Sequence, residues 1–230
     1  MKAPRQLPLP LPARSALGRE DFFVTPANAM AVALIEGWQH WPARKCLLTG
    51  PEGSGKTHLA HVWAALSDAR ILAARDLPDS DIPALACRAV CVEDADAIAG
   101  DRVAEEALFH LHNLVLAEGQ ALLITAQSEA TRWGLSLPDL QSRMMGTQAA
   151  TLAAPDDTLL TALLAKLFDD RQIVPAPDVI PYLVGRMPRS HAAARAIADR
   201  LNAQSLAQKR GITRPMASAA LESLGMDGQV

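Results

Sequence analysis

The sequence predicts an α/β fold in which a parallel sheet is wrapped in helices, followed by a small all-helical domain. Between residues 21 and 154, apolar segments of strand length alternate with helical segments, as in parallel βαβ units. At Ala154-Pro155-Asp156-Asp157 the composition changes to a helix-start signal, and all later segments have helical patterns. We therefore expect a tail at 1–20, an α/β domain at 21–154 and a helical domain at 155–230.

Hydrophobic periodicity predicts each element in order. Residues 22–28 are expected to form a docking strand or turn, and 27–38 a helix. The expected strands are 45–49, 69–74, 89–92, 121–124 and 148–152, and the helices between them are 58–66, 83–87 and 103–118. In the second domain, helices are expected at about 156–171, 176–185, 189–208 and 213–224.

The loop after the first predicted sheet strand matches the phosphate-binding pattern G-x-x-x-x-G-K-[ST] at every fixed position. Its strand-to-helix context is the one that this motif requires. Backbone N–H groups would surround the phosphates, Lys56 would reach the β- and γ-phosphates, and Thr57 would bind Mg²⁺. We predict ADP or ATP with Mg²⁺ as ligands, contacted by Gly50, Pro51, Glu52, Gly53, Ser54, Gly55, Lys56, Thr57 and His58.

Acidic and polar residues end two of the predicted strands. Glu93 and Asp94 follow an apolar strand about forty residues after the loop, where one carboxylate can lie near the metal and another can orient a water molecule. Thr57 and Glu93 are the predicted Mg²⁺ ligands. Thr125, at the end of the next strand, is either a sensor of the γ-phosphate or an ordinary polar strand end.

Two arginines are candidates for the remaining positive charge of a nucleotide site. Arg143 could point toward the γ-phosphate of a neighbouring molecule as an arginine finger, or lie on the surface as an ordinary charge. Arg189 could reach back from the helical domain to the bound nucleotide. Residues 186–214 contain seven basic residues and one acid, which indicates a solvated helix face or a surface for DNA or an acidic partner.

Composition argues against several other classes of protein. The net charge of −3 disfavours a globally basic nucleic-acid binder, and no apolar run is long enough to span a membrane. Three cysteines without a C-x-x-C motif predict buried thiols in a reducing cytoplasm. Neither His58 with His61 nor His110 with His112 forms a convincing metal site.

The tail contains Gln6-Leu7-Pro8-Leu9-Pro10-Leu11. Taken alone, it is either disordered or a proline-stiffened peptide that docks in a shallow apolar pocket.

Taken together, the phosphate loop, the acidic strand end, Thr125, Arg143 and Arg189 resemble the AAA+ ATPases, in particular the DnaA-related branch that includes the Hda regulators. The segments 96–101 and 137–143 add to the resemblance. It implies an AAA+ P-loop domain with a helical lid. It also implies a clamp-binding peptide at Gln6, Leu7, Leu9 and Leu11, which would dock on the β sliding clamp.

In the same family, the arginine finger falls on Arg143, which is implied to act on ATP held by the initiator DnaA, and the second sensor falls on Arg189. The implied function is a negative regulator that makes DnaA hydrolyse its ATP. Contact with DNA would be mainly through the clamp, and self-association is possible. Two features depart from the initiator: the chain ends at Val230 without room for a helix-turn-helix domain, and Glu93 stands where the family commonly has Asp.

Two other functions remain open. A stand-alone P-loop ATPase or phosphotransferase would turn over ATP without partners. An AAA+ adaptor that binds or loads DNA through its basic lid would show steeply salt-dependent DNA binding without the clamp.

Overall fold

The computed structural model of the chain describes residues 22–26, 28–208 and 210–227. The predicted clamp-binding residues Gln6, Leu7, Leu9 and Leu11 lie outside the described residues, so their role stays a prediction.

The α/β domain follows the predicted order closely. It contains α1 (Ala29–Glu36), β1 (Lys45–Thr49), α2 (Lys56–Ser67), β2 (Arg70–Ala73), α3 (Ile82–Ala86), β3 (Val90–Glu93), α4 (Arg102–Ala117), β4 (Leu122–Ala126), α5 (Pro138–Met145) and β5 (Ala149–Thr151). Short 3₁₀ helices join them: η2 (Trp38–His40), η3 (Pro42–Arg44), η4 (Ala74–Asp79), η5 (Ala95–Ile98) and η6 (Ala130–Arg132). The helix α5, which carries Arg143, was not predicted, and Thr125 lies within β4.

Within the described residues, five strands form one parallel sheet in the order β2-β3-β4-β1-β5. Strand β4 lies between β1 and β3, and Ile124 is paired with Leu47 on one side and Val92 on the other. Because the strands are parallel, the carboxyl ends of β1, β4 and β3 lie side by side at one edge. The phosphate loop after β1 and the acids after β3 therefore flank the end of β4.

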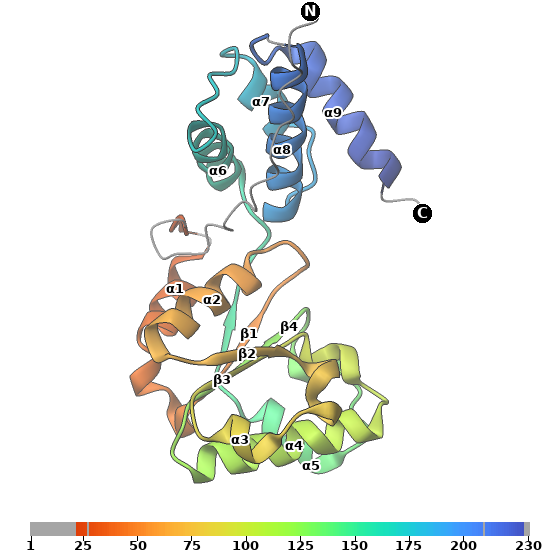
Figure 1. The fold of residues 1–230 in the computed structure, drawn as a ribbon. Helices are drawn as coiled ribbons and strands as arrows, with labels where there is room; N and C mark the ends of the chain where they lie inside the picture. The colour runs from red at the N-terminus through yellow and green to blue at the C-terminus, as the bar shows by residue number, and fades with distance from the viewer. Residues whose placement is uncertain (1–21, 27, 209, 228–230) are drawn as a thin grey trace, which may run out of the picture.

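Helices cover both faces of the sheet (Figure 1), and each face has its own hydrophobic core. Helices α1 and α2 pack on one face, where Ile35, Leu59 and Trp63 are fully buried with Leu48. Helices α3, α4 and α5 cover the other face. Burial on both sides explains why the three central strands, β1, β3 and β4, are nearly continuous apolar runs in the sequence.

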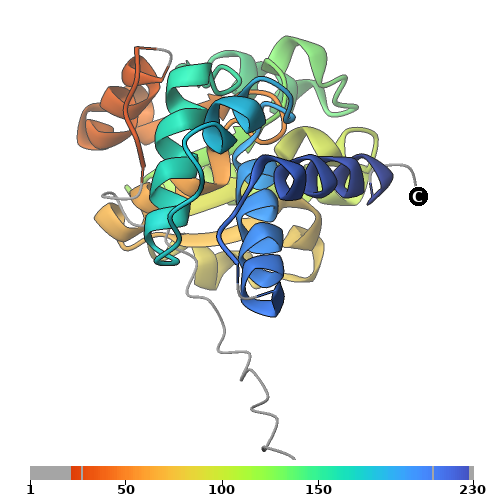
Figure 2. The same ribbon diagram turned by 90° about the horizontal axis from the view of Figure 1, so that it is seen from above.

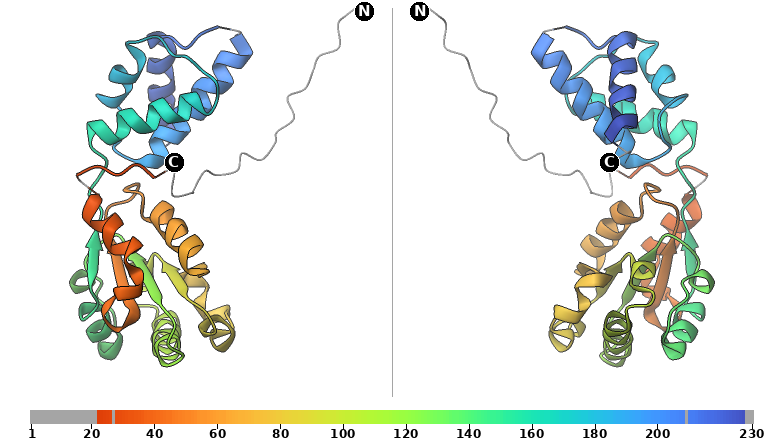
Figure 3. Two further views of the ribbon diagram at one scale, coloured as in Figure 1. Left: turned by 90° about the vertical axis from the view of Figure 1, so that its left-hand side faces the viewer. Right: turned by 90° about the vertical axis from the view of Figure 1, so that its right-hand side faces the viewer.

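The helical domain, which we call the lid, consists of α6 (Asp157–Asp169), α7 (Val179–Val184), α8 (His191–Gln208) and α9 (Arg214–Asp227). Its core is separate and includes Leu164, Leu183 and Ile197. Helix α6 starts where the sequence predicts, because the Asp156 carboxylate accepts a hydrogen bond from the Leu159 N–H at 2.7 Å. Figures 2 and 3 show the lid standing over one end of the α/β domain.

Residues 22–26 and 28 form a turn without a strand, in which the Asn28 side chain accepts from Thr25 N–H and donates to Phe23 O. The expectation of buried thiols is correct for Cys46 and Cys91 but wrong for Cys87, which is exposed at the end of α3. In the part of the chain that the structure describes, no helix has the length and apolar character needed to cross a membrane.

Candidate functional site

The phosphate loop joins β1 to α2, and its backbone is held against the end of β4. Gly50 N–H donates to Ala126 O at 3.2 Å, and Gly55 caps the N-terminus of α2 with a φ of 101°. The Lys56 ammonium lies inside the loop and donates to Gly50 O at 2.7 Å and Pro51 O at 3.1 Å. A helix N-terminus and a buried ammonium together form a site for an anion.

Carboxylates from the end of β3, the residues after it and the phosphate loop act on this ammonium. Burial lowers the pKa of Lys56, whereas Asp94, Asp96, Glu52 and Glu93 raise it. Four carboxylates around a phosphate site would repel a polyphosphate unless a divalent cation offset their charge. The arrangement therefore favours a metal-bound phosphate ligand over a bare one.

Glu93 and Thr57 fit the predicted role of Mg²⁺ ligands. One carboxylate oxygen of Glu93, Oε1, is buried without a hydrogen-bond partner, which fits a metal ligand. Thr57 lines the adjoining cavity. Among the described residues, no three His, Cys, Asp or Glu side chains form a ready-made metal cluster. Mg²⁺ does not need one, because it keeps several water ligands and binds through one or two carboxylates plus phosphate oxygens.

Thr125 lies beneath the site, where it fixes the position of Asp94. The threonine side chain is 1% exposed, and its hydroxyl accepts a hydrogen bond from Asp94 N–H at 3.1 Å. Asp94 has a left-handed φ of 54° and its side chain lines the cavity. Thr125 itself does not line the cavity. Gln127, two residues after Thr125 and just past the end of β4, does. The catalytic role of Thr125 stays a prediction.

The lid touches the phosphate loop at Gly53. The carbonyl oxygen of Gly53 accepts from His191 N–H and from His191 Nδ1, both at 3.0 Å. A Cβ atom at Gly53, whose φ is 73°, would lie 2.1 Å from Ser190 Cβ. Glycine is therefore required here by the lid as well as by the left-handed backbone. Burial, and to a smaller degree Arg195, lowers the pKa of His191, while its bond to Gly53 opposes this.

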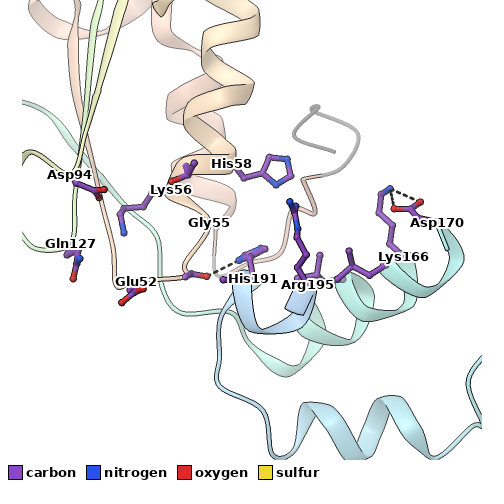
Figure 4. Close-up of a pocket in the computed structure, with 15 residues that line it drawn as sticks. Glu52, Gly55, Lys56, His58, Asp94, Gln127, Lys166, Asp170, His191 and Arg195 are labelled. Atoms are coloured by element: carbon purple, nitrogen blue, oxygen red, sulfur yellow. Dashed lines mark hydrogen bonds and ion pairs between the residues drawn. The ribbon is translucent and has the colours of Figure 1, made fainter. Parts of the chain in front are cut away.

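A cavity of about 450 Å³ lies between the loop and the lid (Figure 4). Its wall in the α/β domain includes the loop, His58, Asp94 and Gln127. The lid contributes side chains from α6 and α8, namely Leu163, Lys166, Leu167, Asp170, His191, Ala192 and Arg195. The volume falls in the range of about 300–1,000 Å³ that is typical of small-molecule sites.

The turn before α1 closes one side of this region. Phe22 is 4% exposed, and its ring meets the His58 ring edge to face at a centroid distance of 5.1 Å. The same ring stacks on His191 at 6.4 Å. Phe22 thus contacts a residue of α2 and a residue of the lid.

The two predicted arginines lie in different places. Arg189 does not line the cavity; its guanidinium donates to Asp157 at 2.6 Å and to Pro155 O at 3.2 Å. Arg195, one turn after His191, lines the cavity instead and extends from α8 into it (Figure 4). Arg143 is exposed on α5 and is not part of the cavity wall.

Sequence reasoning proposed Arg189 from the helical domain but missed Gln127 and the lid residues that line the cavity. One signal was present: His191 and Arg195 are four residues apart on a predicted helix and so share a face. The polar residue Gln127 shortly after an apolar strand was a second signal. Lys166 and Asp170 have the same spacing and form an ion pair at 3.0 Å, which in sequence is indistinguishable from a surface pair.

No protein-family model matches the chain. Among solved structures, it is similar to domain III of the Thermotoga maritima replication initiation protein DnaA, with a TM-score of 0.77 and 18% identity over 93% of this chain and 98% of that one. AMPPCP-bound DnaA from Aquifex aeolicus gives 0.68 and 14% identity, covering 83% and 68% of the two chains. The FIGL-1 AAA domain in complex with ADP gives 0.62 and 14%, covering 86% and 78%. The chain therefore has the α/β fold of AAA+ domains, and it is similar in fold to the AAA+ domain of DnaA.

Proposed function

We propose that the chain is a nucleotide-binding AAA+ regulator of replication initiation of the Hda type. It binds ADP or ATP with Mg²⁺ in the cavity between loop and lid, docks on the DNA-loaded sliding clamp through its N-terminal peptide, and stimulates hydrolysis of ATP held by DnaA.

The main support for nucleotide binding is that the phosphate loop, the acidic residues at the end of β3 and the lid lie around one cavity. Lys56 supplies a cation and Asp94 a carboxylate to the cavity wall, and Arg195 adds a second cation from the lid side. Glu93, next to Asp94, has a buried carboxylate oxygen without a hydrogen-bond partner. Two of the DnaA structures with the same fold are bound to AMPPCP, which supports a nucleotide in the corresponding place here.

Each residue then has a role that follows from its position. Lys56 and the N-terminus of α2 bind the phosphates, and Glu93 with Thr57 would hold Mg²⁺, which would neutralise phosphate charge. Asp94, held by Thr125, is placed to orient a water molecule. For Arg189 to serve as the second sensor, it has to exchange Asp157 for the nucleotide.

The regulatory part rests on the resemblance to the DnaA-related AAA+ proteins. In this proposal Gln6, Leu7, Leu9 and Leu11 tether the chain to the clamp, and DNA is reached mainly through it. Arg143, exposed and away from its own cavity, completes a composite ATPase site on DnaA. Self-association through the same residue is an alternative use of that surface.

The test is hydrolysis of ATP preloaded on DnaA, measured with this protein and ADP, with and without clamp loaded on DNA. We expect clamp-dependent stimulation that Gln6→Ala abolishes and that Arg143→Ala lowers by about 10³-fold or more, the scale of a trans arginine finger. Equal activity of the wild type and R143A would refute the finger. Turnover of ATP by this protein alone, with no effect on DnaA, would favour a stand-alone ATPase.

One observation favours direct DNA binding as a second function. Arg186 and Arg214 lie over the ring of Tyr182, at 4.4 and 4.7 Å from its centroid, and neither forms an ion pair within the described residues. Such guanidinium groups can contact phosphates. Removing both should lower the salt slope of clamp-free DNA binding by about 1.8, since each phosphate contact adds about 0.9.

A further inference from the structure

A buried lysine lies directly beneath the helix that carries Arg143. Lys45, the first residue of β1, is 7% exposed, and its ammonium donates to Arg143 O at 3.0 Å. The same oxygen accepts from the Thr147 hydroxyl at 2.8 Å. Because α5 ends at Met145, these two donors bond a carbonyl of its last turn, where a cation is favoured by the helix dipole.

His112 is the second partner of this lysine. The imidazole is 2% exposed on α4, and its Nε2 lies 3.2 Å from the Lys45 ammonium. An ammonium can only donate, so Nε2 must accept and the imidazole proton must sit on Nδ1. Nδ1 then donates to Asn113 Oδ1 at 3.1 Å. With Lys45 as an ammonium, all three bonds form when His112 is neutral and carries its proton on Nδ1.

Among the residues that the structure describes, no carboxylate compensates the charge of this cluster. Burial and the nearby Arg143 lower the pKa of Lys45, and no carboxylate raises it. Burial also lowers the pKa of His112, the bond to Asn113 opposes this, and the charges of Lys45 and Arg143 lower it further. Within the described residues Arg143 has no ion pair. A buried cation without a carboxylate partner costs stability, so its presence needs an explanation.

We propose that Lys45 and His112 are positioning residues for Arg143, fixing the end of α5 so that the guanidinium, lacking a counter-charge of its own, is presented to an anionic group on a second molecule. This inference rests on the proposed function, in which that group is the phosphate of DnaA-bound ATP. It adds a link within the chain: β1 contacts the end of α5 at its first residue and leads into the phosphate loop after its last.

This connection through β1 supplies an internal control. Damage to β1 would disturb the phosphate loop and weaken the chain's own affinity for ADP. Loss of positioning alone would leave that affinity intact while lowering the stimulation of DnaA. The two measurements therefore separate a positioning role from a merely structural one.

The variants are Lys45→Met, His112→Leu and His112→Gln, with His110→Leu as the matched control, since His110 is exposed two residues away on α4. We expect K45M and H112L to lower stimulated hydrolysis by roughly 10- to 100-fold, the scale of a small misplacement. H112Q should keep most activity because its amide oxygen can accept from Lys45. H110L should match the wild type, and ADP affinity should stay within about twofold in all four.

Hydrogen exchange of this protein alone gives a readout that does not depend on DnaA. In K45M, the amides of Gly146 and Thr147, which close the last turn of α5, should exchange at least about tenfold faster. Unchanged exchange, or full stimulation by K45M and H112L while R143A fails, would overturn the positioning role alone. Equal stimulation by R143A and the wild type would overturn the finger and the positioning role together. A parallel loss of ADP affinity would identify a structural role.

Discussion

The contact between lid and loop predicts a specific effect of Gly53→Ala. The new Cβ would lie 2.1 Å from Ser190 Cβ, so the lid has to move away from the loop. This movement breaks the two hydrogen bonds from His191 to Gly53 O. At about 0.5–1.5 kcal/mol each, they represent about 1–3 kcal/mol of closed-state stability, or roughly a 5- to 150-fold loss of ADP affinity.

The left-handed φ of Gly53 adds a second cost that can be separated from the first. Alanine at a φ of 73° is strained by about 1–2 kcal/mol, but this strain is the same with the lid open or closed. It therefore lowers the free energy of unfolding and leaves the affinity unchanged. Gly134→Ala is the matched control, because Gly134 has a φ of 65° and nothing within 4 Å of its added Cβ.

The assay is titration with a fluorescent ADP analogue, together with thermal unfolding. Both alanine variants should lose stability, and only G53A should lose affinity. Ser190→Gly in the G53A background should restore part of the affinity, since it removes the clashing Cβ and costs only a few tenths of a kcal/mol as a lost helix cap. Wild-type affinity in G53A, or no recovery in the double variant, would refute the lid contact.

Three further predictions concern the same region and the α4 cluster. The pKa values of His112 and His191 are lowered in the folded protein, so below pH 6.5 the unfolded chain binds more protons. The free energy of unfolding, measured by denaturant titration, should keep its full value above pH 6.5 and fall as the pH drops below 6.5, with a shallower fall in His191→Gln; a pH-independent value would contradict this. Thr125→Val leaves the Asp94 N–H without its acceptor and should cost about 1–3 kcal/mol, whereas Thr125→Ser should cost much less; equal values for the two would count against the hydrogen bond. Arg195→Ala should weaken ADP binding by roughly 10- to 150-fold if its charge-assisted bond is worth about 1.5–3 kcal/mol, and unchanged affinity would exclude Arg195 from the site.

The central strands β1, β3 and β4 could be predicted because they are buried apolar runs flanked by turn residues. Their order could not, since periodicity does not specify which strands become neighbours. Helix α5 was missed for a related reason. It has eight residues. Its two buried apolar side chains, Leu140 and Met144, belong to the hydrophobic core on the face of the sheet that α4 covers. A helix this short is stabilised by packing, which a local sequence pattern does not contain.

The candidate site likewise has a part that the sequence predicts and a part that it does not. The phosphate loop and Glu93 with Asp94 are local motifs, and the structure places them on the same edge of the sheet, as expected for parallel strands. The lid residues reach the site only through the path of the chain between β5 and α8. His191 contacts Gly53 across 138 positions, a relation that no spacing rule predicts.

A comparison of Arg189 with Arg195 shows how much depends on this path. Arg189 precedes α8, which begins at His191, so the periodicity of that helix does not fix its direction. Arg195 lies within α8, four residues after the histidine that touches the loop, and the helix brings both side chains to the same face. The contact between His191 and Gly53 therefore determines which arginine faces the cavity. A ligand that tightens this contact would draw Arg195 toward it, whereas Arg189 would first have to leave Asp157. Closing the lid would thus bring the Arg195 guanidinium to the ligand in one movement. Arg189 would need two steps, release from Asp157 and then movement to the ligand.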